Sequence, residues 1–181
     1  MSKRGSTGGP PAPRSPEARD RATTQATTRG EGETFALGHR LGASLRGGEI
    51  VSLEGQLGAG KTVFARGIAA GLGIDPREVG SPTFIIVDRH QGRLTLYHAD
   101  LYRLDREDDV LDLGLDELAA SGGAVMVVEW GERLPAALRD AAIIVRISDA
   151  ASDSNAGTEA GLVPADETRR IEVRGAVHPP I

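Results

Sequence analysis

The sequence predicts an α/β domain with a mixed sheet that is largely parallel but contains one antiparallel hairpin. Three observations support this prediction. Strand-like apolar runs alternate with segments of helical periodicity. A glycine-rich loop lies between the first such run and the helix that follows it. Further along, only a short turn separates two strand-like segments, and because a crossover helix cannot fit there, that pair should be antiparallel.

The N-terminal segment differs in composition from the rest of the chain. Residues 1–34 contain no Val, Ile, Leu, Phe, Tyr or Trp, so they cannot bury enough apolar surface to offset the entropy lost on ordering. Residues 1–30 carry a net charge of +4, whereas the whole chain of 181 residues carries −5. We therefore predict a disordered basic tail over residues 1–32 and one folded domain over residues 33–178.

The first predicted helix follows this tail. Residues 34–46 place Phe35, Leu37, Leu41 and Leu45 on one helical face, and Thr34 has a side chain suited to an N-cap.

The glycine-rich loop comes next, between a strand and a second helix. Residues 49–55 (EIVSLEG) have strand composition, residues 55–62 read GQLGAGKT, and residues 61–72 read as a helix. The loop fits G-x-x-x-x-G-K-[ST] in the strand–loop–helix context that this motif requires. The fold is therefore predicted to be a three-layer domain of the P-loop NTPase type.

The remaining elements complete the mixed sheet. The prediction, in chain order, is a hairpin over 84–89 and 93–98, an acidic helix over 106–121 broken at Gly114, strands over 124–130, 141–148 and 168–175, and a flexible polar insertion over 149–167.

The residue types in the loop are suited to binding a nucleoside triphosphate. Glycines let backbone N–H groups turn toward phosphates at a helix N-terminus. Lys61 would reach the β- and γ-phosphates, and the Thr62 hydroxyl would ligate Mg²⁺. The chain has only two lysines among its 21 cationic residues, and Lys61 is the one in the folded part. We predict contacts to the nucleotide from Gly55, Gln56, Leu57, Gly58, Ala59, Gly60, Lys61 and Thr62.

Two carboxylates are candidates for the acid that such a site needs near Mg²⁺. Glu129 ends the apolar run AVMVVE, and Asp100 follows RLTLYHA. The alternative for each is a solvated carboxylate at a strand end. Trp130, the only tryptophan, is either a core residue or a neighbour of the nucleotide. His98 shares a strand face with Asp100 and alone reads as a structural histidine.

Several function classes lack their signatures. There is no cysteine, which excludes disulfides and fits a cytoplasmic protein. A membrane-spanning helix is not predicted, because the sequence has no run of ~18 apolar residues. The only asparagine, Asn155, is followed by Ala, so a guanine-reading N-K-x-D is missing. Residues 132–140 are a weak candidate for a kinase lid. The acidic folded part argues against a large phosphate-backbone footprint of its own.

Taken together, the motifs resemble those of the TsaE (YjeE) family, the small ATPases of bacterial tRNA threonylcarbamoyladenosine synthesis. The resemblance covers about residues 33–148 and is carried by TFALGHRLG, GQLGAGKT, SPTF, HADLYR, LGLDEL, VVEWGERLP and the closing strand RRIEV. It implies one P-loop domain that binds and slowly hydrolyses ATP with Mg²⁺. It also implies work with TsaD and TsaB, which transfer the threonylcarbamoyl group to tRNA, so that contact with tRNA is indirect. The ATP cycle would reset that transferase.

The resemblance also implies roles by position. Lys61 would hold phosphates, Thr62 and Glu129 would ligate Mg²⁺, and Asp100 would be the acid needed for hydrolysis. These make Asp100, Lys61 and Glu129 the predicted catalytic residues.

Further nucleotide contacts are implied at other positions. Thr34 would line the adenine pocket, Arg103 belongs to the same signature as Asp100, and Arg169 or Arg170 would touch the nucleotide.

Two other functions remain open at this point. One is a P-loop phosphotransferase acting on a small metabolite, with Asp100 as base. The other is a nucleotide-dependent interaction module whose hydrolysis is incidental.

Overall fold

The computed structural model describes residues 23–80, 86–104, 106–120, 123–150 and 168–175. Within them, a seven-stranded sheet has the order β1-β7-β6-β2-β5-β4-β3. The strands are β1 (Thr23–Arg29), β2 (Ile50–Glu54), β3 (Val87–Gln91), β4 (Thr95–Asp100), β5 (Ala124–Glu129), β6 (Ile143–Asp149) and β7 (Thr168–Arg174). The helices are α1 (Glu31–Ser44), α2 (Lys61–Gly71), α3 (Glu107–Leu111), α4 (Leu115–Ala120) and α5 (Ala136–Ala141).

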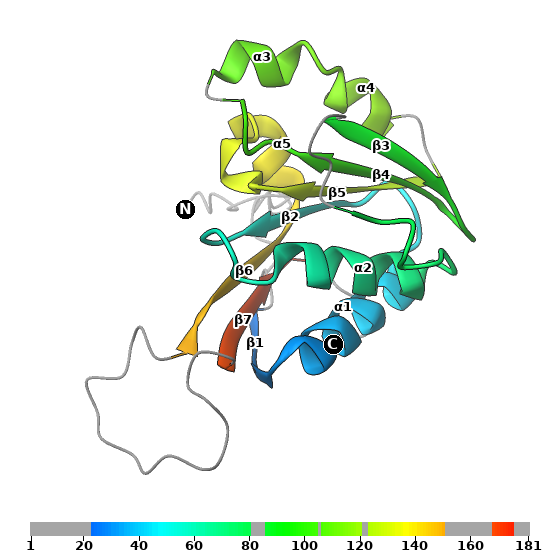
Figure 1. Ribbon diagram of the computed structural model, residues 1–181. Coiled ribbons are helices and arrows are strands. Elements are labelled where there is room, and N and C mark those ends of the chain that lie inside the picture. The colour runs from blue at the N-terminus through cyan, green and yellow to red at the C-terminus, as the bar shows by residue number, and fades with distance from the viewer. Residues whose placement is uncertain (1–22, 81–85, 105, 121–122, 151–167, 176–181) are drawn as a thin grey trace, which may run out of the picture.

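The sheet is parallel in its centre and antiparallel at both edges. Strands β6, β2, β5 and β4 pair in parallel. Strand β3 pairs antiparallel with β4, while β7 pairs antiparallel with both β6 and β1. Helices α1 and α2 cover one face, and α3, α4 and α5 lie on the other (Figure 1). This confirms the predicted three-layer α/β fold, its mixed sheet and the 84–98 hairpin. The break of the acidic helix at Gly114 is also confirmed, by separate helices α3 and α4.

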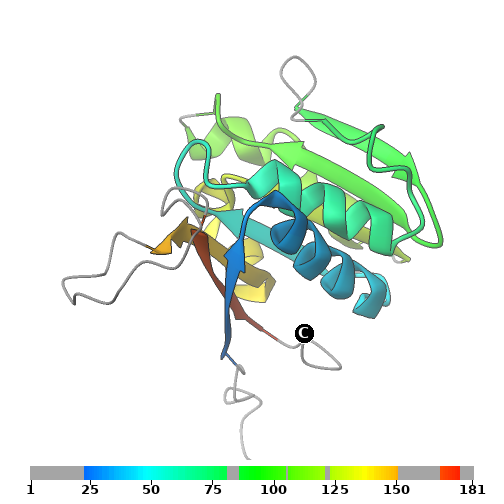
Figure 2. The ribbon, with the colours of Figure 1, turned by 60° about the horizontal axis from the view of Figure 1, so that its bottom comes forward.

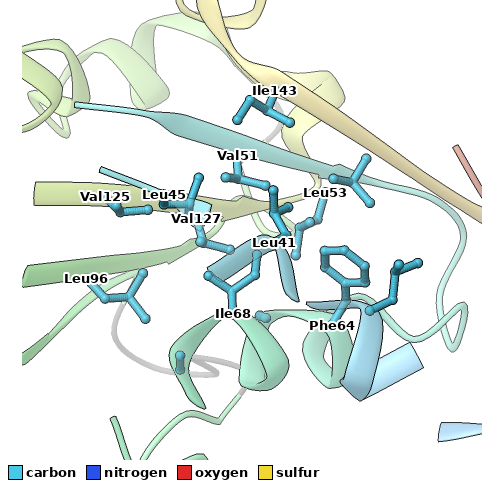
Figure 3. Packing of buried hydrophobic residues seen from close by; sticks show 14 of the residues in the cluster. Leu41, Leu45, Val51, Leu53, Phe64, Ile68, Leu96, Val125, Val127 and Ile143 are labelled. Atoms are coloured by element: carbon cyan, nitrogen blue, oxygen red, sulfur yellow. The ribbon is translucent and has the colours of Figure 1, made fainter. Parts of the chain in front are cut away.

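Alternation along the central strands divides the core into two clusters. Val51, Val125 and Val127 join the cluster beneath α1 and α2, which also contains Phe64 and Ile68 (Figure 3). The residues that alternate with these face the other layer, where Ile50, Met126 and Val128 pack with residues of the α3–α5 side. Because both faces are covered, β2 and β5 are buried along their whole length and are mostly apolar, as central parallel strands are.

Helices α1 and α2 touch through their backbones. Figure 2 shows them side by side in front of the sheet. A Cβ atom on Gly42 would lie 2.2 Å from the Ile68 carbonyl oxygen, and one on Gly71 would lie 2.3 Å from the His39 carbonyl oxygen. Glycine is therefore required in this contact, which fixes α1 against the helix that follows the glycine-rich loop.

The domain begins earlier in the chain than predicted. The tail was expected to be disordered to residue 32, but β1 starts at Thr23 and α1 at Glu31. The strand lies at the edge of the sheet and has no bulky apolar residue, and only Thr28 in it is buried. Residues 1–22, 176–181 and most of the predicted insertion, 151–167, lie outside the described residues.

The start of α1 also differs from the prediction. Gly30, with a φ of 95°, is the N-cap, and Thr34 lies one turn inside the helix. The Thr34 hydroxyl donates to the Gly30 carbonyl oxygen at 3.2 Å instead of capping a backbone N–H group. No helix in the part of the chain described here is long and apolar enough to cross a membrane.

Candidate functional site

The glycine-rich loop joins the end of β2 to the start of α2, in the predicted context. Gly60 is the N-cap of α2 and has a φ of 105°, a left-handed conformation that glycine adopts without strain. A Cβ atom on Gly55 would lie 2.3 Å from the Ile147 carbonyl oxygen. The glycines at these two positions let the loop turn tightly and place the N-terminal N–H groups of α2 at the end of the parallel strands.

Lys61 is buried beneath this loop, with 5% of its surface exposed. Its Nζ atom donates to the carbonyl oxygens of Gly55 at 2.7 Å and Gln56 at 2.8 Å. The same atom lies 3.9 Å from the centre of the Trp130 ring. Burial lowers the pKa of Lys61 below its ordinary value, although the nearby carboxylates of Glu129, Glu132 and Asp100 act in the opposite direction.

Glu129 links the loop helix to the neighbouring strand. The Thr62 hydroxyl donates to Glu129 Oε2 at 2.9 Å, and Glu129 Oε1 lies 3.0 Å from His98 Nε2. Glu129 and His98 are 2% and 1% exposed. The two residues that the sequence predicted as Mg²⁺ ligands are therefore in contact, even though they are far apart in the chain.

The residues at this point fit a magnesium ion bound together with phosphates. A hydroxyl and a carboxylate are hard oxygen donors, which Mg²⁺ prefers, and Mg²⁺ is commonly held by one or two protein ligands plus substrate phosphates. Among the described residues no cluster of three or more His, Cys, Asp or Glu side chains could hold a metal alone. The donor set thus suits a shared site better than an all-protein cage.

Asp100 ends β4 beside Glu129, its partner in the parallel register. Its Oδ1 atom accepts a hydrogen bond from the Tyr102 backbone N–H at 2.9 Å. The loop that follows is held by Arg133, whose Nη1 donates to the carbonyl oxygens of Leu101, Tyr102 and Leu104 at 3.0, 2.6 and 2.8 Å.

Trp130 follows the end of β5, and its ring packs beside Tyr102 in the loop that follows β4. It has a φ of 60°, a conformation that costs a non-glycine residue of order 1 kcal/mol. The next residue packs directly on β2, because a Cβ atom on Gly131 would lie 2.0 Å from Ser52 Oγ. The centres of the Trp130 and Tyr102 rings are 5.0 Å apart. The central carbon of the Arg133 guanidinium lies 6.0 Å from the centre of the Tyr102 ring.

A pocket of about 570 Å³ opens over this group of residues. It is lined by Glu31, Leu57, Gly58, Gly60, Lys61, Thr62, Val63, Ile86, Asp100, Tyr102, Arg103, Glu129 and Trp130. The volume and the mixture of loop backbone, cations and carboxylates suit a ligand of nucleotide size.

A second pocket of about 410 Å³ lies on the other side of the loop. Thr34 and Arg169 line it together with Gly30, Glu31, Gly58, Ala59, Gly60 and Val63. Thr34 is fixed there by a hydrogen bond of 2.8 Å between its hydroxyl and that of Thr28. Arg169 makes an ion pair of 3.1 Å with Asp149, and Arg170 faces the other side of the sheet because neighbouring strand residues alternate.

The structure therefore brings most of the predicted site residues to one loop. Gly55 and Gln56 line neither pocket, and their carbonyl groups instead hold Lys61. The SPTF motif of residues 81–84, whose Thr83 could read either as a sensor of the γ-phosphate or as part of a turn, lies outside the described residues. Sequence reasoning missed Arg133 and Tyr102, and it interpreted His98 as structural. The adjacent EW and HADLYR motifs were the only signals that pointed toward them.

The chain is similar in sequence and in structure to proteins of one family. Residues 28–156 match the family described as threonylcarbamoyl adenosine biosynthesis protein TsaE. The chain is 43% identical to the tRNA threonylcarbamoyladenosine biosynthesis protein TsaE of Treponema pallidum, over 64% of this chain and 84% of that protein. It is 40% identical to the protein of the same name from Streptomyces coelicolor, over 77% of this chain and 88% of that one. The crystal structure of Bacillus subtilis YdiB superimposes with a TM-score of 0.62 and 31% identity, covering 87% of this chain and 88% of that chain.

Proposed function

Because the chain belongs to the TsaE family, we propose that it binds ATP with Mg²⁺ and hydrolyses it as an accessory subunit in threonylcarbamoyladenosine biosynthesis on tRNA. On this proposal its ATP cycle resets a transferase formed by TsaD and TsaB homologues. The chain does not transfer the threonylcarbamoyl group itself, it meets tRNA only through that complex, and it works in the cytoplasm.

One observation carries the nucleotide part of the proposal. The Thr62 hydroxyl and the Glu129 carboxylate meet at 2.9 Å beside the loop that holds Lys61, although 67 positions separate them in the sequence. A hydroxyl at the start of the loop helix and an acid at the end of the adjacent parallel strand are the Mg²⁺ ligands of P-loop ATPases.

Each residue then has a distinct task. Lys61 and the loop N–H groups bind the phosphates, and Lys61 must exchange the Gly55 and Gln56 carbonyl oxygens for phosphate oxygens to do so. Mg²⁺ would be held by Thr62 and Glu129 and, when bound, would neutralise the negative charge of the phosphates. Asp100, in the same pocket, orients the attacking water.

The second pocket is where we place the adenine base of the nucleotide. Thr34 and Arg169 lie on the far side of the loop from Glu129 and Asp100, so a nucleotide that spans Gly58 and Gly60 would have its phosphates in one pocket and its adenosine in the other.

The test is ATP turnover by the purified full chain, with and without the TsaD and TsaB homologues of the same organism. We expect slow Mg²⁺-dependent hydrolysis that is lost in Lys61→Ala. Absence of hydrolysis with both partners present, or unchanged turnover in Lys61→Ala, would contradict the proposal. Formation of a phosphorylated metabolite by the chain alone would favour the phosphotransferase instead.

A further inference from the structure

The imidazole of His98 lies directly behind Glu129, outside the residues that line the pocket. His98 is 1% exposed, and its Nε2 atom is 3.0 Å from Glu129 Oε1. The other carboxylate oxygen, Oε2, accepts from the Thr62 hydroxyl at 2.9 Å. The two oxygens of one carboxylate are thus divided between a partner in the core and a partner at the pocket.

The sheet register produces this contact. Strands β4 and β5 are parallel, with His98 opposite Val127 and Asp100 opposite Glu129. Side chains two positions apart point to the same face of a strand, so His98 and Glu129 are diagonal neighbours on the face that carries Val127. Val127 belongs to the core cluster beneath α1 and α2, which is the side on which Thr62 lies.

The hydrogen-bonding state of His98 argues against a role in packing alone. Its Nδ1 atom is buried and has no hydrogen-bond partner among the described residues. A buried polar atom without a partner is unfavourable, and an apolar side chain would avoid that cost. The hydrogen bond that His98 does make is with a carboxylate, which only accepts, so Nε2 carries the proton and donates to Oε1.

We infer that His98 is a positioning residue, which fixes Glu129 so that Oε2 faces Thr62 and the magnesium ion between protein and phosphates. The inference rests on the proposed function, in which Thr62 and Glu129 bind Mg²⁺. Donors behind a metal-binding carboxylate hold it in one orientation, and their loss weakens metal affinity by about 10- to 100-fold. His98 acts on the ion only through Glu129.

Three substitutions at His98 separate the loss of the hydrogen-bond donor from a change in side-chain volume. In His98→Gln the amide nitrogen reaches about as far from the backbone as Nε2 does, so the hydrogen bond to Oε1 is kept. In His98→Asn the amide nitrogen ends near the position of Nδ1 and cannot reach Oε1. His98→Leu removes the donor and keeps an apolar core.

His90 provides a matched control for the loss of a buried imidazole. It is 8% exposed and lies on β3, where its Nε2 is 3.4 Å from Asp88 and away from the pocket. His90→Leu should therefore change stability without changing the response to Mg²⁺.

The experiment measures the affinity of the full chain for ADP by calorimetry, in Mg²⁺ and in EDTA, with thermal unfolding as a check of folding. We expect His98→Leu and His98→Asn to lower affinity about 10-fold or more in Mg²⁺, with less than about a twofold change in EDTA. His98→Gln should recover most of the wild-type Mg²⁺ response, and His90→Leu should retain all of it.

Three results would overturn the inference while leaving the proposed function in place. These are an unchanged Mg²⁺ response in His98→Leu and His98→Asn, an equal loss of affinity in Mg²⁺ and in EDTA, or a His98→Gln no better than His98→Asn. If His98→Leu does not fold, the comparison of Gln with Asn decides. A wild-type chain whose ADP affinity does not depend on Mg²⁺ would overturn the proposed function and this inference together.

Discussion

The ammonium of Lys61 lies 3.9 Å from the centre of the Trp130 ring while it donates to the carbonyl oxygens of Gly55 and Gln56. The cation and the ring attract each other, and the contact is worth about 0.5–2 kcal/mol in general. Binding of phosphates by Lys61 must change this contact. The structure therefore couples the loop to the only tryptophan in the chain.

The first prediction uses that coupling as an optical signal. Addition of ATP or ADP with Mg²⁺ should change the tryptophan emission in a saturable manner, because Lys61 moves from the ring toward phosphate. Lys61→Met should alter the emission of the free protein and abolish the nucleotide-dependent change. A titration that leaves the wild-type emission unaltered at saturating nucleotide, measured independently by calorimetry, would refute the coupling.

The second prediction concerns the pH dependence of stability. Burial lowers the folded-state pKa of Lys61 below the 10.5 of the unfolded chain, so the folded state disfavours the charged form. Between the lowered pKa and 10.5, Lys61 binds more protons in the unfolded chain than in the folded one. Its contribution to the free energy of unfolding therefore rises with pH across that range.

Lys61→Met removes that dependence. Without nucleotide the variant should be more stable than the wild type at pH 7, and its advantage should shrink as the pH approaches 10.5. Urea unfolding of both proteins at several pH values measures the difference in their free energies of unfolding. Titrating groups that the two proteins share contribute equally to both and cancel in this difference. A difference that stays constant or grows with pH would contradict the lowered pKa.

The third prediction tests the loop after Asp100. Arg133→Ala removes the donor to the Leu101, Tyr102 and Leu104 carbonyl groups, so the loop loses its anchor and Asp100 its position. We expect turnover to fall about tenfold or more while ATP affinity changes less, since misplaced reacting groups affect the rate above all. Arg106→Ala is the control, because Arg106 is 75% exposed and pairs only loosely with Asp108. Equal turnover in the two variants would show that Arg133 does not position the loop.

The fourth prediction concerns the contact between α1 and α2. Gly42→Ala places a methyl group 2.2 Å from the Ile68 carbonyl oxygen, and the helices must separate to admit it. We expect a loss of about 1–3 kcal/mol in the free energy of unfolding. Gly32→Ala, in the same helix but with no atom beyond the neighbouring backbone of that helix within 4 Å of the added Cβ, should be neutral or stabilise by up to about 1 kcal/mol. Chemical denaturation of both variants makes the comparison, and a Gly42→Ala protein as stable as Gly32→Ala would refute the close contact.

The sequence predicted those parts of the molecule that are specified by residues close together in the chain. The loop from Gly55 to Thr62 carries its own signature, and the apolar run that ends at Glu129 is buried because it is central in the sheet. Local signals were enough to predict the loop between strand and helix, the hairpin, and the break at Gly114.

Features that depend on distant pairing were missed. Strand β1 has little apolar character and exists because β7 pairs with it, so neither the strand nor the helix start at Gly30 could be read locally. The contact of His98 with Glu129 requires the register of two parallel strands, and the contacts of Arg133 span about 30 positions of the chain. Such contacts follow from topology, which the motif pattern alone does not specify.

The pairing of β1 with β7 has a practical consequence for anyone who shortens this chain. Removal of residues 1–29 as an apparent tail would strip the outer strand from the sheet and leave the N–H and C=O groups on one side of β7, those that pair with β1, without partners, while the other side stays paired with β6. An uncovered strand edge is a template for association between molecules. The shortened protein would also lose Thr28, the partner of the Thr34 hydroxyl. Aggregation after such a truncation would reflect a missing edge and not an intrinsically insoluble domain.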